Sequence, residues 1–125
     1  MKRPLRILVA NEPRLCREAL AETLQELRPH AEVTPVEPED LDRAIISWAP
    51  QMVVCSALPR RARCEPFAWM VLPSDGEPRA VVSIAGQHTT VANPPLTSIL
   101  AVVDQTEAMA HVSPWSFTAV IHSDL

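Results

Sequence analysis

The sequence predicts one three-layer α/β domain whose first three strands are parallel and whose later strands form an antiparallel hairpin. Two observations support this fold. Over residues 5–59, strand-length apolar segments alternate with segments of helical periodicity, which is typical of a parallel sheet with crossover helices. Two later apolar segments are joined by a link too short for a crossover helix. With 125 residues, 47% of them hydrophobic, the chain can bury one core.

The first two elements are a buried strand at about 5–10 and a helix at about 14–28. The strand is apolar at every position except Arg6, so both of its faces are expected to be covered. The helix is amphipathic and Pro29 ends it. Its inner face is expected to carry four residues at helical spacing: Cys16, Leu20, Leu24 and Leu27.

A second strand at 31–36, a second helix at 39–49 and a third strand at 52–56 follow. Pro35 predicts an edge position for the second strand, because proline cannot donate a ladder hydrogen bond. Pro38 suits the first turn of the helix, and the third strand is apolar throughout. Trp48 and Trp69 are expected in the core.

The second half predicts two strands, at 67–73 and 79–85, that pair antiparallel. Their link contains the Asp-Gly turn signal. Residues 86–93 can add a turn and a short strand, and Asn93 is a candidate cap for a last helix. The inner face of that helix is expected to carry Leu96, Ile99, Leu100 and Val103. The domain is therefore expected at 1–110, with 111–125 as a mobile tail or an interface arm.

Composition argues against several functions. The net charge of −4 does not favour nucleic-acid binding, and no apolar run reaches the length of a membrane span. The N-terminal residues lack a secretory pattern, so a cytoplasmic location is expected. The three cysteines and four histidines lack metal-ligand spacing, and neither a glycine-rich phosphate loop nor a nucleophile elbow occurs. We expect no metal, no cofactor and no enzymatic activity.

Residues 5–59 resemble a response-regulator receiver domain. The resemblance rests on "RILVANEP" with its following helix and on "PQMVVCSALP", and "LTSILAVVD" is similar to the last helix of that family. It implies a flavodoxin-type fold with magnesium-binding acids after the first strand and a phosphoacceptor aspartate after the third. The corresponding positions hold Asn11 and Glu12 in place of two acids, and Cys55 with Ser56 in place of the aspartate.

This degenerate pocket predicts that the chain is not phosphorylated at the usual site. The lysine of the family has no counterpart, since Lys2 is the only lysine. The two helices that usually flank the fourth strand have no sequence to form them either. Phosphoryl transfer needs a metal, a nucleophile and a cation on the transferred group, and the sequence weakens all three.

The leading hypothesis is therefore a non-enzymatic, receiver-like signalling protein that acts by binding another protein, whose identity the sequence does not give. An alternative is a sensor of a small anion that uses Asn11, Glu12 and an arginine loop. A weaker alternative is a thiol redox switch at Cys55, although buried cysteines are usually inert. The arginine loop consists of Arg60, Arg61 and Arg63.

A homodimer built on the hairpin, the last helix or the tail is also expected. Four apolar residues at strand spacing could form an exposed surface, because the helices that would cover the fourth strand are missing. The tail adds two aromatic residues. The candidate interface residues are Trp69, Val71, Val82, Ile84, Trp115 and Phe117.

Overall fold

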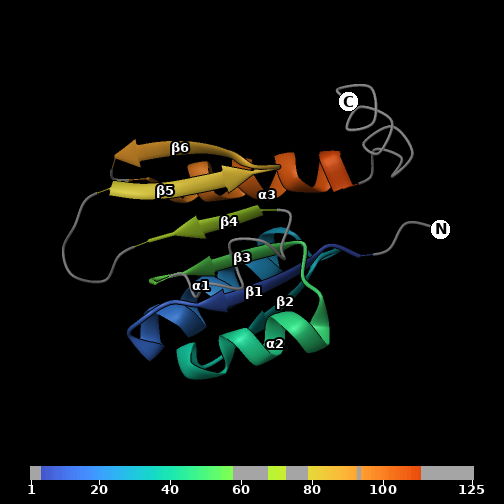
Figure 1. Cartoon of the computed structure of the whole chain (residues 1–125), viewed down its shortest axis with the longest axis vertical. Coiled ribbons are helices and arrows are strands. Elements are labelled where there is room, and N and C mark those ends of the chain that lie inside the picture. The colour runs from blue at the N-terminus through green and yellow to red at the C-terminus, as the bar shows by residue number, and fades with distance from the viewer. Residues whose placement is uncertain (1–3, 58–67, 73–78, 93, 111–125) are drawn as a thin grey trace.

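The computed structural model describes residues 4–57, 68–72, 79–92 and 94–110, and these form one mixed sheet with helices on both faces (Figure 1). The strand order is β2-β1-β3-β4-β5-β6. The elements are β1 (Arg6–Ala10), α1 (Arg14–Leu27), β2 (Glu32–Pro35), the short 3-10 helix η1 (Pro38–Asp40), α2 (Leu41–Trp48), β3 (Met52–Cys55), β4 (Ala68–Val71), β5 (Arg79–Ile84), β6 (Gln87–Ala92) and α3 (Leu96–Ala110).

The first half is a parallel sheet, as the alternation of strands and helices predicted. β1 lies between β2 and β3, and β3 continues in parallel to β4. All four residues of β3 are buried, which explains why its sequence is apolar throughout. β2 is the edge strand, and it ends at Pro35 where an unpaired backbone position is tolerated.

The second half is antiparallel. β5 pairs antiparallel with β4, which confirms the predicted hairpin, although its link lies outside the described residues. β6 pairs antiparallel with β5 and confirms the predicted additional strand. Ala85 and Gly86 form the two-residue turn between them, both with positive φ (51° and 86°), as in the hairpin turns that match strand twist.

Two hydrophobic clusters lie on opposite faces of the sheet. On the α1/α3 face, both helices pack on alternate strand residues. On the α2 face, Leu41 and Ile45 cover the other residues of the strands, and Trp48 packs at the margin. The α1/α3 face carries Ile7, Val9, Met52, Val54, Met70 and Val82, and the α2 face carries Leu8, Ala10, Val53, Cys55 and Trp69.

The inner face of α1 differs from the prediction. Leu24 is buried and Leu20 packs against the core, as predicted, whereas Cys16 is exposed and Leu27 is 43% exposed. Arg17 and Ala21 are buried in their place. At about 100° per residue, Cys16 and Leu27 lie roughly 80–100° away from the line through the buried residues. The helical spacing was predicted correctly, but the buried face of the helix is rotated, so that only Leu20 and Leu24 of the predicted stripe contact the core.

The buried face of α3 also differs in part from the predicted one. Ile99 and Val103 are buried as predicted, and Leu100 packs against the core, but Leu96 is 39% exposed. Val102 and Thr106 complete the buried line, and the Thr106 hydroxyl donates to the carbonyl of Val102, one turn earlier. The helix therefore accommodates a polar residue at a buried position by bonding it within the helix.

Candidate functional site at the carboxyl edge of the parallel strands

The carboxyl ends of β1 and β3 lie side by side, with Ala10 in register with Cys55. Asn11 and Glu12 follow β1, and Ser56 follows β3, so the sequence-predicted pocket residues are brought together. The chain leaves β1 toward β2 on one side, while β3 lies on the other. In doubly wound sheets, ligands bind at such a reversal of strand order.

The two loops at this edge are joined by a hydrogen bond. The backbone N–H of Glu12 donates to the hydroxyl oxygen of Ser56 at 2.9 Å. Ser56 therefore serves as an acceptor that ties the loop after β1 to the loop after β3. The Glu12 side chain itself is exposed.

Asn11 is buried at this edge, with 4% of its surface exposed. Its backbone carbonyl accepts a bond from the Arg17 guanidinium at 3.4 Å. Its side-chain oxygen, however, has no hydrogen-bond partner in the part of the chain that the structure describes. A buried acceptor without a partner costs free energy, so Asn11 is a local departure from a fully satisfied core.

Cys55 is the last residue of β3, the position that the resemblance to receiver domains would assign to the phosphoacceptor. It is fully buried among the residues of the α2 face. This burial raises the pKa of its thiol from 9.0 to about 12. The environment is the opposite of the electropositive, accessible setting that activates a cysteine, so the thiol stays protonated at neutral pH.

Arg17 is the residue at this edge that the sequence pattern did not single out. It is 5% exposed, and its guanidinium donates to a Glu37 carboxylate oxygen at 3.1 Å as well as to the Asn11 carbonyl. It thereby connects α1, the loop after β1 and the loop after β2. Its spacing from Ala21 and Leu24, four and seven residues along, was the available signal of an inward position.

The arginine loop of the anion-sensor alternative, Arg60, Arg61 and Arg63, lies outside the described residues, as does Cys64. Within the described ranges no group of three or more His, Cys, Asp or Glu side chains could hold a metal ion. Among the described residues that directly follow β1 and β3, Glu12 carries the one carboxylate, and it is exposed; the nearby Arg17 guanidinium is buried and engaged with Glu37.

The predicted interface residues do not form one surface. Trp69 and Val71 belong to the α2 face, whereas Val82 and Ile84 belong to the α1/α3 face. The register explains this, because Trp69 pairs with Ser83 and Met70 pairs with Val82. Trp69 and Val82 are also buried within the chain. Trp115 and Phe117 lie outside the described residues.

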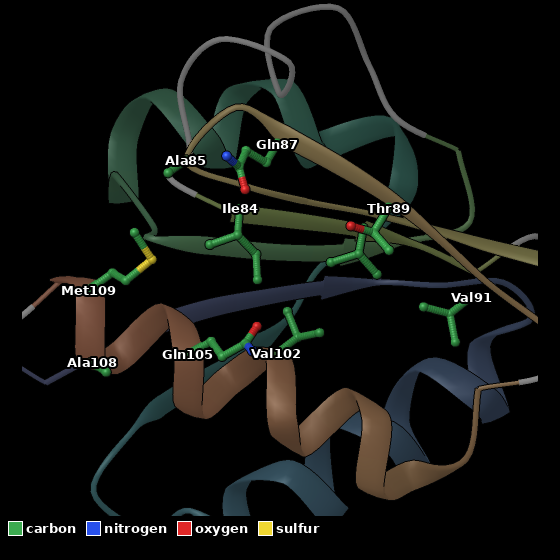
Figure 2. Close-up of a pocket in the computed structure, with 10 residues that line it drawn as sticks. Ile84, Ala85, Gln87, Thr89, Val91, Val102, Gln105, Ala108 and Met109 are labelled. Carbon is green, nitrogen blue, oxygen red and sulfur yellow. The ribbon is translucent and has the colours of Figure 1, made fainter. Parts of the chain in front are cut away.

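A groove of about 650 Å³ lies between the β5–β6 hairpin and α3. Figure 2 shows Ile84 of the hairpin and Val102 of α3 pointing toward each other across it. Its lining is mainly apolar, with Gln87, Thr89 and Gln105 as polar members. Sequence patterns did not predict this groove, since it depends on how far α3 stands from the hairpin.

No protein-family model matches this chain, and no curated protein matches it significantly. Among the described residues, every helix is too short or too polar to cross a membrane.

Proposed function

We propose that this chain is a non-enzymatic, receiver-like regulatory domain that acts by binding another protein. The observation that carries the proposal is the state of the receiver-like pocket. The position of the phosphoacceptor holds Cys55, a buried thiol on the α2 face, and the neighbouring Ser56 hydroxyl is bonded to the loop after β1. The strand order β2-β1-β3-β4 agrees with the start of the flavodoxin-like order.

The chemistry of the pocket supports a role without phosphoryl transfer. Magnesium prefers several oxygen ligands in octahedral geometry, and Glu12 is the one carboxylate that follows β1 or β3 directly. A protonated thiol with a pKa near 12 is a poor nucleophile at neutral pH. The buried guanidinium of Arg17 is paired with Glu37 and the Asn11 carbonyl, so it is not directed at a transferred group.

The contact surface that best fits this role is the groove between the hairpin and α3. It combines apolar side chains with a few amides and hydroxyls, which is the usual composition of a binding site. Its lining comes from the β5–β6 hairpin and α3 and includes no residue of the loops after β1 and β3, so binding there would not require the receiver-like pocket.

The anion-sensor alternative depends on the arginine loop and stays a prediction. The Glu12 carboxylate would repel an anion at the pocket, and Arg17 is already neutralised by Glu37. The redox-switch alternative is disfavoured by the burial of Cys55.

Two measurements test the proposal. Incubation with a small phosphodonor and magnesium should leave the intact mass unchanged; a phosphoryl group that is lost on mutation of Cys55 or Ser56 would overturn the inactive-pocket part. In affinity capture from the source cells, Gln105→Arg should lose a protein that the wild type retains. Glu26→Arg, on an exposed position of α1, is the matched control and should retain it. Identical capture by all three chains would contradict the groove as the contact surface.

A further inference from the structure

The two edges of the sheet differ in how they are protected from pairing with another chain. β2 is four residues long, ends in Pro35 and carries a charged residue, Glu32. β6 is six residues long and contains neither proline nor a Lys, Arg, Asp or Glu residue; five of its residues are exposed and the sixth is half-buried. Natural sheets normally block exposed edges with charges, proline or short strands. β6 has none of these features, and no strand in the described part of the chain pairs with its outer edge, so this edge can accept a further strand.

The backbone groups available at this edge follow from the hairpin geometry. Ile84 pairs with Gln87 across the two-residue turn, and residues that flank such a turn exchange both of their hydrogen bonds. Alternate β6 residues therefore bond to β5. The remaining residues direct their N–H and C=O groups away from the sheet: His88, Thr90 and Ala92.

A parallel strand following α3 in the same chain is a poor occupant of this edge. β6 runs in the same direction as β1, and α3 lies on the same face of the sheet as α1. The β1-α1-β2 connection moves across that face toward the β2 edge. A crossover through α3 to a parallel strand outside β6 would move the opposite way and be left-handed, which is rare.

We propose that β6 pairs antiparallel with β6 of a second copy of this chain, about a two-fold axis perpendicular to the sheet. Thr90 then lies opposite its own counterpart, and His88 lies opposite the partner's Ala92. This register uses all three outward-facing residues and forms about six backbone hydrogen bonds. The sheets of the two copies become one continuous sheet.

The side chains of β6 suit pairing with themselves. On the α1/α3 face, Thr89 comes opposite the partner's Val91, and both line the groove next to α3. On the α2 face, two Thr90 side chains meet, a favourable cross-strand pair. No Lys, Arg, Asp or Glu meets its own copy, so the isologous contact brings none of these charges together.

This inference rests on the sheet edge and not on the receiver-like proposal. A monomeric protein would overturn it without affecting the absence of phosphorylation or the groove as a contact surface. The two are therefore tested separately.

Sedimentation equilibrium gives the first test. The wild type should dimerise by high micromolar concentration, and Thr90→Lys should weaken the dimer at least about ten-fold, because two ammonium groups meet on the axis. Thr34→Lys, on the opposite edge strand, is the matched control and should dimerise as the wild type does; circular dichroism confirms that each variant is folded. A monomeric wild type, or a dimer unaffected by Thr90→Lys, would overturn the proposal.

Cysteine cross-linking tests the register. In a Cys16→Ser, Cys64→Ser background, Thr90→Cys should form a disulfide-linked dimer on mild oxidation, because the two residues face each other. His88→Cys should not, since its counterpart lies about 13 Å away along the strand, beyond the reach of a disulfide. Equal cross-linking of both variants would exclude this register, and cross-linking of neither would exclude the pairing.

Discussion

The carboxyl edge of the parallel strands and the hairpin side of the sheet differ in how many of their interacting groups are already engaged within the chain. At the carboxyl edge, the Ser56 hydroxyl and the Arg17 guanidinium are engaged within the chain, and the Cys55 thiol is buried. On the hairpin side, the outer edge of β6 pairs with no strand among the described residues, and the groove beside α3 leaves apolar side chains accessible. In this α/β sheet, the polar groups after β1 and β3 are therefore used within the chain, whereas the β5–β6 side offers apolar side chains and strand backbone for contacts.

The largest expected loss of stability comes from placing an aspartate at the buried end of β3. Cys55→Asp should reduce the free energy of unfolding by about 3–5 kcal/mol at neutral pH, because a carboxylate would be buried without a partner. Urea denaturation measures this change. The loss should shrink at acidic pH, where the carboxyl group is protonated in both states. Stability equal to the wild type at pH 7 would show that Cys55 lies at an open pocket.

A milder change at the same position measures the apolar character of the site. Cys55→Ser should cost roughly 1–3 kcal/mol, the usual penalty for a hydroxyl without a partner in an apolar environment. The matched control is Cys16→Ser on the exposed surface of α1, which should be nearly neutral. Equal effects of the two substitutions would contradict the difference in burial.

The two cysteines that the structure describes should also differ clearly in their reactivity toward alkylating reagents. Cys16 should react with an alkylating reagent in the folded protein, whereas Cys55 should react only through unfolding. Because the pKa of Cys55 rises from 9.0 to about 12 on folding, the unfolded thiol ionises first as pH increases. This group therefore makes stability fall from about pH 9 toward pH 12. Rapid labelling of Cys55 at neutral pH would revive the redox-switch hypothesis.

Much of the fold followed from local patterns in the sequence. The apolar strands, the proline-limited helices and the short link between β4 and β5 predicted both halves of the sheet. The buried faces of the helices were harder to predict from the sequence. Cys16 and Leu27 fit a helical stripe, yet Arg17 is inward because Glu37, twenty residues along, pairs with it.

The sequence predicted which residues lie at the candidate site, but not the contacts that these residues make. The order of elements brought Asn11, Glu12, Cys55 and Ser56 to one edge. That Ser56 accepts from the backbone of Glu12 depends on loop geometry, which the sequence does not encode as a motif. The separation of Trp69 and Val71 from Val82 and Ile84 depends on strand register, and a shift of one residue would have reversed it.

A substitution of Asn11 tests whether the carboxyl edge of β1 and β3 is optimised for stability, and a smaller effect is expected. Since its buried side-chain oxygen has no described partner, Asn11→Ala should change the free energy of unfolding by no more than about 1 kcal/mol. The relief of an unsatisfied acceptor offsets the lost packing. Chemical denaturation measures this. A loss of several kcal/mol would show that the amide makes contacts beyond the described residues.

The smallest expected effect lies on the surface between the two helices of the α1/α3 face. Arg28, the residue that caps the C-terminus of α1, donates two hydrogen bonds to Asp104 of α3, at 2.7 and 2.8 Å, and this pairing lowers the pKa of the Asp104 carboxyl. A lowered folded pKa means that the contribution is present above the unfolded pKa of Asp104 and is lost as pH falls through the folded value. Asp104→Asn should therefore flatten the acid side of the stability profile slightly, and high salt should reduce the difference from the wild type. Identical acid profiles in low salt would mean that the Arg28–Asp104 pair adds nothing measurable to the stability of the fold.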